Sequence, residues 1–286
     1  MNEIHRKILS ILDRDVICEL KNAENHIPES LLFHNHDGCE IYLFLNGDVN
    51  YYTESNGKKL ERGDLILTRA YAFHGSVLVS PALHDRIVIN IRESVLSGLG
   101  SPETDLSECF LRTPSCELNL LHLEEDDIRR FTKLARQLQA ELLKHPWGSD
   151  VMSRALLQQL LVMIGRLTVI DRPQEYPGIM PDFLAETFSY IEDHLCEKIT
   201  LTQLAEHVHH NGTYLSRCFK KLSGASLTQY ILAKRIALAQ KLLREGHSPY
   251  DACELSGFNN YSNFSRSFSR QAGCSPREYQ KLFLQS

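Results

Sequence analysis

The chain repeats one short sequence at a fixed interval. Leu215-Ser-Arg-Cys-Phe219 returns 49 residues later as Phe264-Ser-Arg-Ser-Phe268. The same interval then pairs Gly224 with Gly273, Ser226 with Ser275 and Tyr230 with Tyr279. Repetition in a constant register indicates a duplicated structural unit, and such a unit decides the architecture of the part of the chain that contains it.

Each copy predicts an amphipathic helix, because its apolar residues recur at helical spacing. These are Leu215, Cys218, Phe219 and Leu222 in the first copy, and Phe264 and Phe268 in the second. The opposite face carries Thr213, Ser216, Arg217 and Lys220 in the first copy, and Ser262, Ser265, Arg266 and Ser269 in the second. Arginine pairs with guanine through two hydrogen bonds, and hydroxyls contact bases or phosphates. One such helix alone would be an ordinary solvated helix, whereas two in register favour DNA recognition.

The charge distribution agrees with DNA binding, although the formal net charge is −5. Residues 181–286 carry 12 Lys or Arg and 10 Asp or Glu, a net charge of +2. The first 180 residues carry 19 and 26, a net charge of −7. Local basic patches on an acidic protein suit a specific DNA-binding protein, because phosphate contacts are local and salt-dependent.

Composition bounds the remaining possibilities. A chain of 286 residues with 43% hydrophobic residues can form two or three domains with cores of their own. Its eight cysteines include no C-x-x-C pair, which favours a reducing compartment over a zinc site or a disulfide framework. The start of the chain is charged, and no apolar run is long enough to span a bilayer, so we expect a cytoplasmic protein without a membrane partner.

Proline and capping residues divide the C-terminal half. Three of the ten prolines lie within residues 171–181, which predicts a linker. Beyond it, Thr200-x-x-Gln203, Ser226-x-x-Gln229 and Ser275-x-x-Glu278 fit capping boxes, and Ser248 precedes a proline suited to the first helical position. Gly224, Gly246 and Gly273 supply helix ends. The predicted helices are 182–196, 201–208, 213–222, 226–245, 249–256, 261–271 and 276–284.

Two pairs of these helices form helix-turn-helix units, 201–208 with 213–222 and 249–256 with 261–271. The helix that connects them, near 20 residues, would be about 30 Å long. This length approaches the roughly 34 Å that separates successive major-groove faces on one side of the duplex. One chain can therefore place both recognition helices on the same side of DNA.

Residues 182–286 resemble the AraC/XylS family of bacterial transcription regulators. The resemblance rests on Gly257-Phe258, on Tyr261-Ser-Asn-Phe-Ser-Arg-x-Phe268 and on Gly273-x-Ser-Pro-x-x-Tyr279. It implies a domain that binds double-stranded promoter DNA, with base contacts at Thr213, Ser216, Arg217, Ser262, Asn263 and Arg266. Lys220, Ser265 and Arg270 complete the expected DNA-binding set. The family also implies a homodimer, a small-molecule effector that is often a sugar, and contact with RNA polymerase in an activator.

The N-terminal part predicts a different architecture. Residues 30–95 alternate polar and apolar residues in short β-prone runs, separated by turn sequences such as Asn46-Gly47-Asp48 and Arg62-Gly63-Asp64. This pattern is typical of a small antiparallel barrel or sandwich. The expected fold is therefore α+β and multidomain: a cupin-like barrel at 1–122, a helical dimerisation region at 123–170, the linker at 171–181 and a DNA-binding domain at 182–286.

Within the barrel, His34-x-His36-x-x-x-Glu40 looks like the first cupin motif, and Gly63 to His74 like a degraded second one in which Arg69 and Tyr71 replace the expected proline and glycine. In metal-binding cupins the equivalent residues hold one divalent ion, and here they are His34, His36, Glu40 and His74. Imidazole and carboxylate suit a first-row metal, and His34 and His36 are expected on one strand face. Two alternatives remain: the same four residues bind an organic effector such as a sugar without metal, or the histidines are structural.

Two amphipathic helices follow the barrel. The first has apolar residues at Ile128, Phe131, Leu134, Leu138 and Leu142, after an acidic start at 124–127. This seam can be core or dimer interface. Residues 151–167 are more evenly apolar and are expected to pack inward.

These observations together predict a DNA-binding transcription regulator that responds to an effector. An effector in the barrel would change how the dimer presents its DNA-binding domains. The resemblance implies an activator of genes for carbohydrate uptake or metabolism. The alternative from another class is a metal-dependent cupin enzyme, an oxygenase or isomerase, with a helical appendage. No catalytic residues are assigned, because the sequence contains no nucleophile elbow and no Gly-rich phosphate loop.

Overall fold

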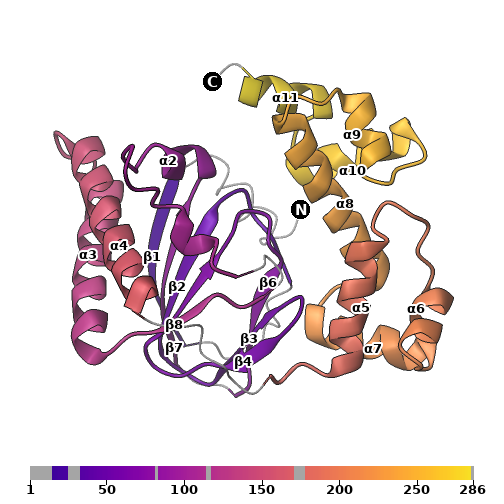
Figure 1. Ribbon diagram of the computed structural model, residues 1–286, viewed down its shortest axis with the longest axis horizontal. Coiled ribbons are helices and arrows are strands. Elements are labelled where there is room, and N and C mark those ends of the chain that lie inside the picture. Colours follow the sequence, from indigo (N-terminus) through magenta and orange to yellow (C-terminus); the bar gives the residue numbers. More distant parts are fainter. Residues whose placement is uncertain (1–14, 25–32, 81–82, 114–116, 171–177, 285–286) are drawn as a thin grey trace. The chain divides into compact units, whose positions relative to one another are not determined.

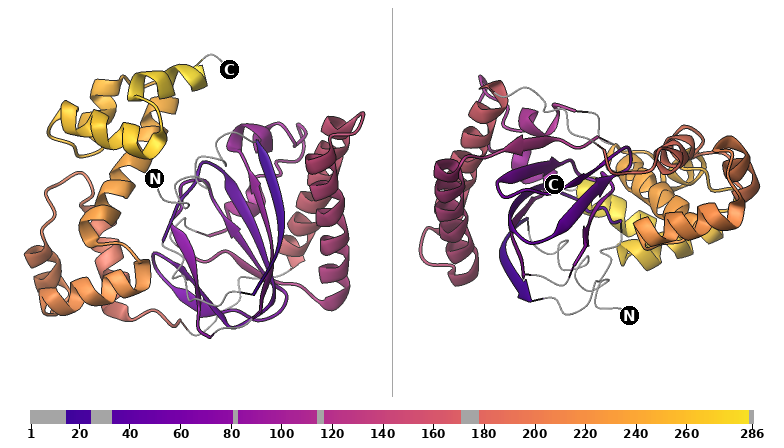
Figure 2. Two further views of the ribbon diagram at one scale, coloured as in Figure 1. Left: turned by 180° about the vertical axis from the view of Figure 1, so that it is seen from behind. Right: turned by 90° about the horizontal axis from the view of Figure 1, so that it is seen from below.

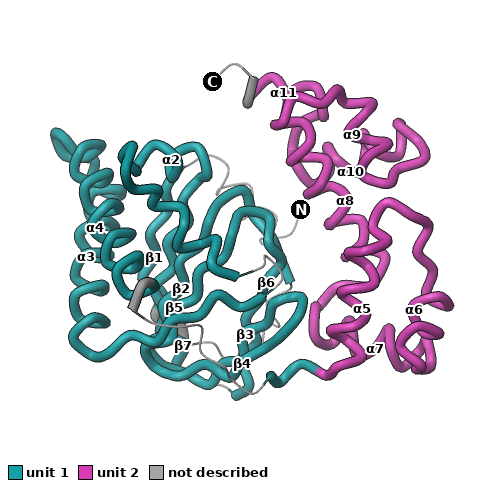
Figure 3. Tube along the Cα trace, in the orientation of Figure 1, with its two compact units in different colours: residues 1–180 teal, residues 181–286 magenta. Residues whose placement is uncertain are grey.

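The computed structural model describes residues 15–24, 33–80, 83–113, 117–170 and 178–284. The chain divides into two compact units, Met1–Met180 and Pro181–Ser286 (Figure 3). Most of the predicted linker, residues 171–177, lies outside the described residues.

The first unit contains two antiparallel sheets (Figure 1). The larger has the strand order β1 (Val16–Glu24), β7 (Leu83–Ile91), β2 (Cys39–Asn46), β5 (Asp64–Thr68), β8 (Leu120–His122). The smaller has the order β4 (Gly57–Lys59), β3 (Val49–Thr53), β6 (His74–Leu78). The structure thus confirms the antiparallel β fold that the alternating pattern predicted.

Period-two alternation gives the large sheet two different faces. Ile41 and Leu43 of β2 join a core cluster with residues of the following helices. Tyr42 and Phe44, which alternate with them, join a second cluster with Tyr51 of the small sheet. The second cluster therefore lies between the two sheets, and it is here that the inward-facing polar residues of β2 and β6 meet.

Helices cover the outer face of the large sheet. The short elements α2 (Glu93–Ser97) and η1 (Glu108–Phe110) precede the long helices α3 (Glu125–Lys144) and α4 (Ser149–Ile170), which pack side by side (Figure 2). In the α3 seam, Ile128, Phe131 and Leu138 are fully buried. The remaining two seam residues are partly buried against the same cluster. The seam is therefore part of the core of its own unit.

The second unit is helical throughout. Its helices are α5 (Asp182–Asp193), α6 (Leu201–His207), α7 (Gly212–Ser223), α8 (Leu227–Arg244), α9 (Pro249–Leu255), α10 (Tyr261–Ala272) and α11 (Pro276–Leu284). All the predicted helices are confirmed, and the largest difference is that the first ends at Asp193 and not at 196.

Local sequence sets these boundaries. Thr200 and Ser226 form capping boxes with Gln203 and Gln229. Ser275 and Glu278 exchange equivalent hydrogen bonds at the start of α11, and Ser248 caps α9 ahead of its first-turn proline. Gly224 and Gly273 end α7 and α10 with φ of 70° and 78°, a conformation that favours glycine.

The duplication seen in the sequence is also a duplication of packing. Phe219 and Tyr230 lie with ring centroids 5.3 Å apart at 69°. Their counterparts Phe268 and Tyr279 lie 5.3 Å apart at 80°. All four side chains are buried, so each half of the unit is built around the same edge-to-face aromatic pair.

Within the described residues, no helix combines the length and the apolar character needed to cross a bilayer.

Candidate nucleic-acid interface and barrel histidine cluster

The first recognition helix, α7, separates an apolar face from a polar one. Leu215 and Phe219 are fully buried. On the other side Thr213, Arg217 and Lys220 are exposed, and Ser216 is half-buried. The helix begins at an Asn211 cap, whose side-chain oxygen accepts hydrogen bonds from the backbone N–H groups of residues 213 and 214. The polar residues near its start are therefore presented on a well-capped, accessible first turn.

The second recognition helix, α10, repeats this arrangement. Phe264 and Phe268 are fully buried. The exposed side chains are Ser262, Asn263, Arg266 and Arg270, with Ser265 half-buried. Asn260 caps the helix by accepting a 3.0 Å hydrogen bond from the Asn263 backbone N–H. Neither α7 nor α10 contains an acidic residue, so both faces suit a polyanion.

The two arginines are held differently. Arg266 Nη2 donates to Asn263 Oδ1 at 2.5 Å, and its Nε donates to the Ser262 carbonyl at 3.3 Å. The Arg217 guanidinium lies 5.7 Å from the centre of the Tyr214 ring, in cation–π contact. Tyr214 is 42% exposed at the start of α7, and our sequence reasoning missed it. An aromatic residue inside a polar helical stripe was the signal that could have identified it.

Helix α8 belongs to both halves of the unit and packs against α7 at one end and α9, α10 and α11 elsewhere. Its 18 residues correspond to about 27 Å at 1.5 Å per residue. This is slightly shorter than the predicted length of about 30 Å.

The four barrel residues singled out in the sequence come together. The ring centroid of His74 lies 4.5 Å from that of His34 and 5.1 Å from that of His36. One ligand atom from each of the three histidines lies within 4.8 Å of the others. Glu40 reaches both His36 and His74. Except for His34, which is partly exposed, these side chains are buried.

One detail of the prediction was wrong, because His34 and His36 do not share a strand face. Both precede β2, and the chain bends at residues 37–38 before the strand begins at Cys39. His34 instead forms an isolated antiparallel bridge with His74, through two 3.0 Å backbone hydrogen bonds. Pairing with β6 therefore brings these histidines together, and strand periodicity does not.

The hydrogen bonds of the cluster fix its protons. His36 Nδ1 lies 2.9 Å from the Gly38 carbonyl and His74 Nδ1 lies 2.9 Å from the Ala72 carbonyl. A carbonyl oxygen only accepts, so both Nδ1 atoms carry hydrogen. Both Nε2 atoms then point at Glu40, at 3.3 Å from Oε2 for His36 and 3.4 Å from Oε1 for His74.

Electrostatic interactions shift the pKa values of Glu40 and His74 in opposite directions. Burial alone would raise the pKa of the Glu40 carboxyl, but His74 and His36 bring it well below its usual value. For His74, burial opposes protonation, yet the facing carboxylate raises the pKa overall. The cluster thus attracts positive charge, whether as a proton or as a cation.

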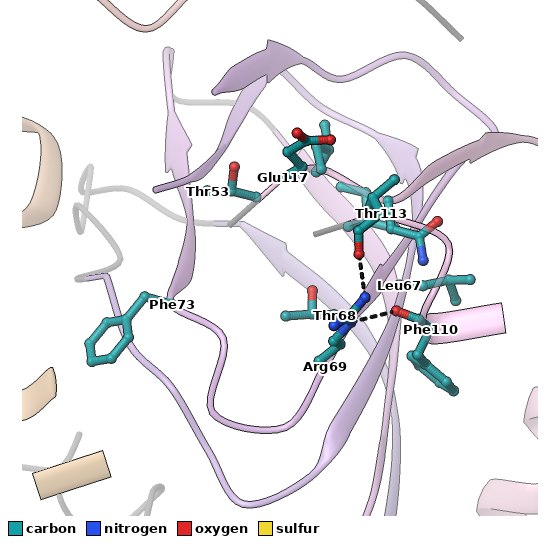
Figure 4. Close-up of a pocket in the computed structure, with 11 residues that line it drawn as sticks. Thr53, Leu67, Thr68, Arg69, Phe73, Phe110, Thr113 and Glu117 are labelled. Atoms are coloured by element: carbon teal, nitrogen blue, oxygen red, sulfur yellow. Dashed lines mark hydrogen bonds between the residues drawn. The ribbon is translucent and has the colours of Figure 1, made fainter. Parts of the chain in front are cut away.

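A small cavity lies next to the cluster, and Figure 4 shows the residues that line it. Thr53 and Thr68 line it, and they stand directly opposite His74 and Glu40 in the neighbouring strands. Arg69 closes its wall by donating to the carbonyls of Phe110 and Thr113. The residue that departs from the expected cupin motif is therefore a structural tie between the end of β5 and the η1 region.

The comparisons with known proteins agree with the helical architecture. The family described as "Helix-turn-helix domain" matches residues 204–282. The chain is 25% identical over 260 residues to the "probable transcriptional regulator LumQ" of Photobacterium leiognathi, covering 89% of this chain and 94% of that protein. It is also 25% identical over 276 residues to the "HTH-type transcriptional activator RhaR" of Yersinia pseudotuberculosis, covering 92% and 89%. Over residues 204–282 the chain therefore carries a helix-turn-helix domain of the AraC type, and over most of its length it is similar to transcription regulators.

Another relative matches over about a third of the chain. The HTH-type transcriptional regulator YobQ of Bacillus subtilis is 37% identical over 94 residues, which are 32% of this chain and 39% of that protein. Among solved structures, ToxT of Vibrio cholerae bound to an unsaturated fatty acid aligns over 95% of this chain and 96% of its own, with 14% identity and a TM-score of 0.40.

With this domain, and with transcription regulators as its relatives over most of its length, the chain is a DNA-binding transcription regulator. The cupin-enzyme alternative is therefore set aside.

Proposed function

We propose that α7 and α10 enter successive major-groove segments on one side of promoter DNA. The observation that carries this is the pair of equivalent exposed faces, each with arginine, hydroxyls and no acid, on helices joined through α8. Arg217 and Arg266 are assigned to base edges, because a guanidinium can bond to guanine O6 and N7 together. Lys220 and Arg270, further along the two helices, are assigned to phosphates.

The remaining polar residues support these contacts. Thr213, Ser216, Ser262 and Ser265 offer hydroxyls to bases or phosphates, and Asn263 offers an amide that suits adenine. Asn263 already binds Arg266. DNA binding therefore exchanges that exposed hydrogen bond for contacts with the duplex, and such an exchange costs little because both side chains are in water.

The β unit is the proposed sensor, with an effector bound at His34, His36, Glu40 and His74. The sequence resemblance implies a sugar, and the name of the Yersinia relative describes an activator. On this basis the chain activates genes of carbohydrate uptake or metabolism, in contact with RNA polymerase. The proposed domains are those of the sequence: barrel 1–122, dimerisation region 123–170, linker 171–181 and DNA-binding domain 182–286.

A homodimer through residues 123–170 needs a surface other than the buried α3 seam. Such a surface exists where α3 ends and α4 begins, because Leu143, Trp147, Val151 and Met152 are exposed apolar side chains within ten residues of chain. A second copy of the chain is the proposed occupant. Sedimentation velocity of the full chain at micromolar concentration tests this, and a monomer would contradict it.

DNA binding is tested by selecting sequences from a random duplex pool with the full chain and then measuring affinities. Arg217→Ala and Arg266→Ala are each expected to cost about 1–3 kcal/mol at the selected site and to relax specificity at one base pair. Arg277→Ala is the matched control, because it removes one exposed positive charge from the same unit outside α7 and α10.

The outcomes separate three possibilities. Loss confined to the selected site supports base contacts. A uniform loss on all sequences, with a salt slope smaller by about one, would reassign these arginines to phosphates. Equal affinities for both variants and the control would refute the proposed interface.

A further inference from the structure

We propose that His34, His36, His74 and Glu40 hold one divalent first-row transition-metal ion between the two sheets. The ion would take the place of the proposed sugar as the ligand of these four residues, and the inference rests on the regulator role only for its biological meaning. The site itself is argued from the geometry of the described residues.

The first observation is a pair of unsatisfied nitrogen atoms. His36 Nε2 and His74 Nε2 are buried and have no hydrogen-bond partner among the described residues. Their Nδ1 hydrogens are already committed to the Gly38 and Ala72 carbonyls. Each neutral ring therefore presents a lone pair to a carboxylate that also has only lone pairs to offer. Buried polar atoms are rarely left without partners, and a cation between them satisfies all of them at once.

The second observation is the spacing of these atoms. The Glu40 oxygens lie 3.3 Å and 3.4 Å from the two Nε2 atoms. Charge-assisted hydrogen bonds of this type are usually shorter, about 2.7–2.9 Å. Two ligands that each lie about 2.05 Å from a tetrahedral ion are instead roughly 3.3–3.4 Å apart. The observed distances are thus those between neighbouring ligands of one ion, and not those of a hydrogen bond.

The hydrogen bonds of the Nδ1 atoms are also those expected of histidine ligands to a metal ion. A histidine ligand generally donates its second N–H to a backbone carbonyl or a carboxylate, which orients the ring. Both His36 and His74 do so. His34 supplies the third imidazole, within 4.8 Å of the other two donor atoms. Three imidazoles and one carboxylate form a donor set typical of zinc, iron, nickel or copper, and not of magnesium or calcium.

Room in the described part of the barrel favours an ion over a larger ligand. Aromatic and aliphatic side chains fill the space between the sheets, among them Tyr42, Phe44 and Tyr51. The cavity that borders the cluster has room for about one water molecule. An ion needs no more than the space enclosed by its ligands.

The position of the site gives the ion a structural consequence. Glu40 belongs to β2 of the large sheet, whereas His74 belongs to β6 of the small sheet. An ion bound to both would connect the two sheets and stabilise the β unit by mass action. Metal occupancy is therefore expected to raise the thermal stability of this unit.

The experiment uses the untagged full chain, freed of metal by dialysis against a chelator. Zinc or cobalt(II) alone is then added, and bound metal is measured by elemental analysis, by the visible absorption of cobalt and by calorimetric unfolding. We expect one equivalent of metal, a cobalt spectrum typical of four-coordination by nitrogen and oxygen, and a higher unfolding temperature for the β unit.

Two isosteric variants and one control localise the site. Glu40→Gln and His36→Gln are expected to weaken binding by at least about 100-fold, since even outer-shell changes cost 10–100-fold. His84→Gln is the matched control, because it removes another buried imidazole from the same barrel while leaving the cluster intact. Full affinity in the control supports the assignment, and unchanged affinity in the two cluster variants overturns it.

The wild-type chain decides the question if a variant fails to fold. Absence of stoichiometric zinc and cobalt binding overturns the inference, and a proton shared with Glu40 is then the occupant. Affinity for selected DNA is measured on the same preparations. A chain that binds DNA but no metal contradicts this inference alone, whereas one that binds metal but selects no DNA contradicts the proposed function alone.

Discussion

Replacing Gly257 by alanine tests how the second recognition helix is positioned. Gly257 lies in the turn between α9 and α10 with φ of 81°. An added Cβ would lie 2.7 Å from Cys196 Cα and 2.9 Å from the Leu195 carbonyl oxygen. That carbonyl also accepts a 2.8 Å hydrogen bond from Arg235. The methyl group therefore meets backbone that is already fixed by another contact.

Gly246 provides the matched control. Its φ is 93°, but an added Cβ would meet nothing within 4 Å. Both substitutions place alanine in a left-handed conformation, which lowers the free energy of unfolding by roughly 1–2 kcal/mol. Both also make the unfolded chain less flexible, which raises the free energy of unfolding by about 0.4–1 kcal/mol. Gly257→Ala adds about 1–3 kcal/mol of overpacking. We expect a net loss of about 0.5–1 kcal/mol for Gly246→Ala and about 2–4 kcal/mol for Gly257→Ala.

Differential scanning calorimetry of the full chain measures the difference. For a domain of about 100 residues, 1 kcal/mol corresponds to roughly 4 °C or more, so the helical unit of Gly257→Ala should unfold about 8 °C below that of Gly246→Ala. DNA affinity should fall with it, because the turn sets the angle at which α10 leaves α9. Equal unfolding temperatures and equal DNA affinities in the two variants would refute the steric argument.

Two further predictions concern the β unit. Trp147→Lys should shift the full chain from dimer toward monomer in sedimentation velocity, because the side chain is fully exposed in a single copy of the chain. Gln137→Lys, at an exposed position of α3, is the control, and an unchanged dimer in Trp147→Lys would exclude this surface. Burial lowers the pKa of His84 to about 3, with Arg86 and Lys21 contributing, whereas the unfolded value is about 6.5. The unfolded chain therefore binds a proton between these pH values that the folded chain does not, so this contribution to stability is complete above about pH 6.5 and decreases as the pH falls toward 3. His84→Gln should flatten the dependence of the β unit's unfolding temperature on pH in that window, and identical slopes in the two proteins would contradict the assignment.

The helices of the second unit were predictable because their boundaries and buried faces depend on residues that are close together in the sequence. Capping residues such as Thr200 and Ser226 act on backbone groups within one turn, and glycines such as Gly224 act on their own φ. A 3.6-residue period separates buried Phe264 from exposed Arg266 without knowledge of any partner. The register of the repeat agrees with the packing, since Phe219 and Phe268 occupy equivalent positions and each contacts the equivalent tyrosine.

The barrel was predictable only in outline. Alternation indicated strands, but it placed His34 and His36 on one strand. The helical spacing of the α3 seam did not decide whether its apolar residues lie in the core or at a dimer interface. Contacts between segments far apart in the sequence decided both questions. The bridge between His34 and His74 joins residues 40 positions apart, and the packing of Phe131 against the large sheet places the α3 seam in the core.

By itself, the sequence determined a duplicated helix-turn-helix unit and the polarity of its two exposed faces, because these depend on contacts within a few residues. Only the tertiary structure decided that His36 and His74 turn their Nε2 atoms toward one carboxylate and that each is oriented by a backbone carbonyl. Such an arrangement depends on the distance between two sheets, which the periodicity of the sequence does not predict.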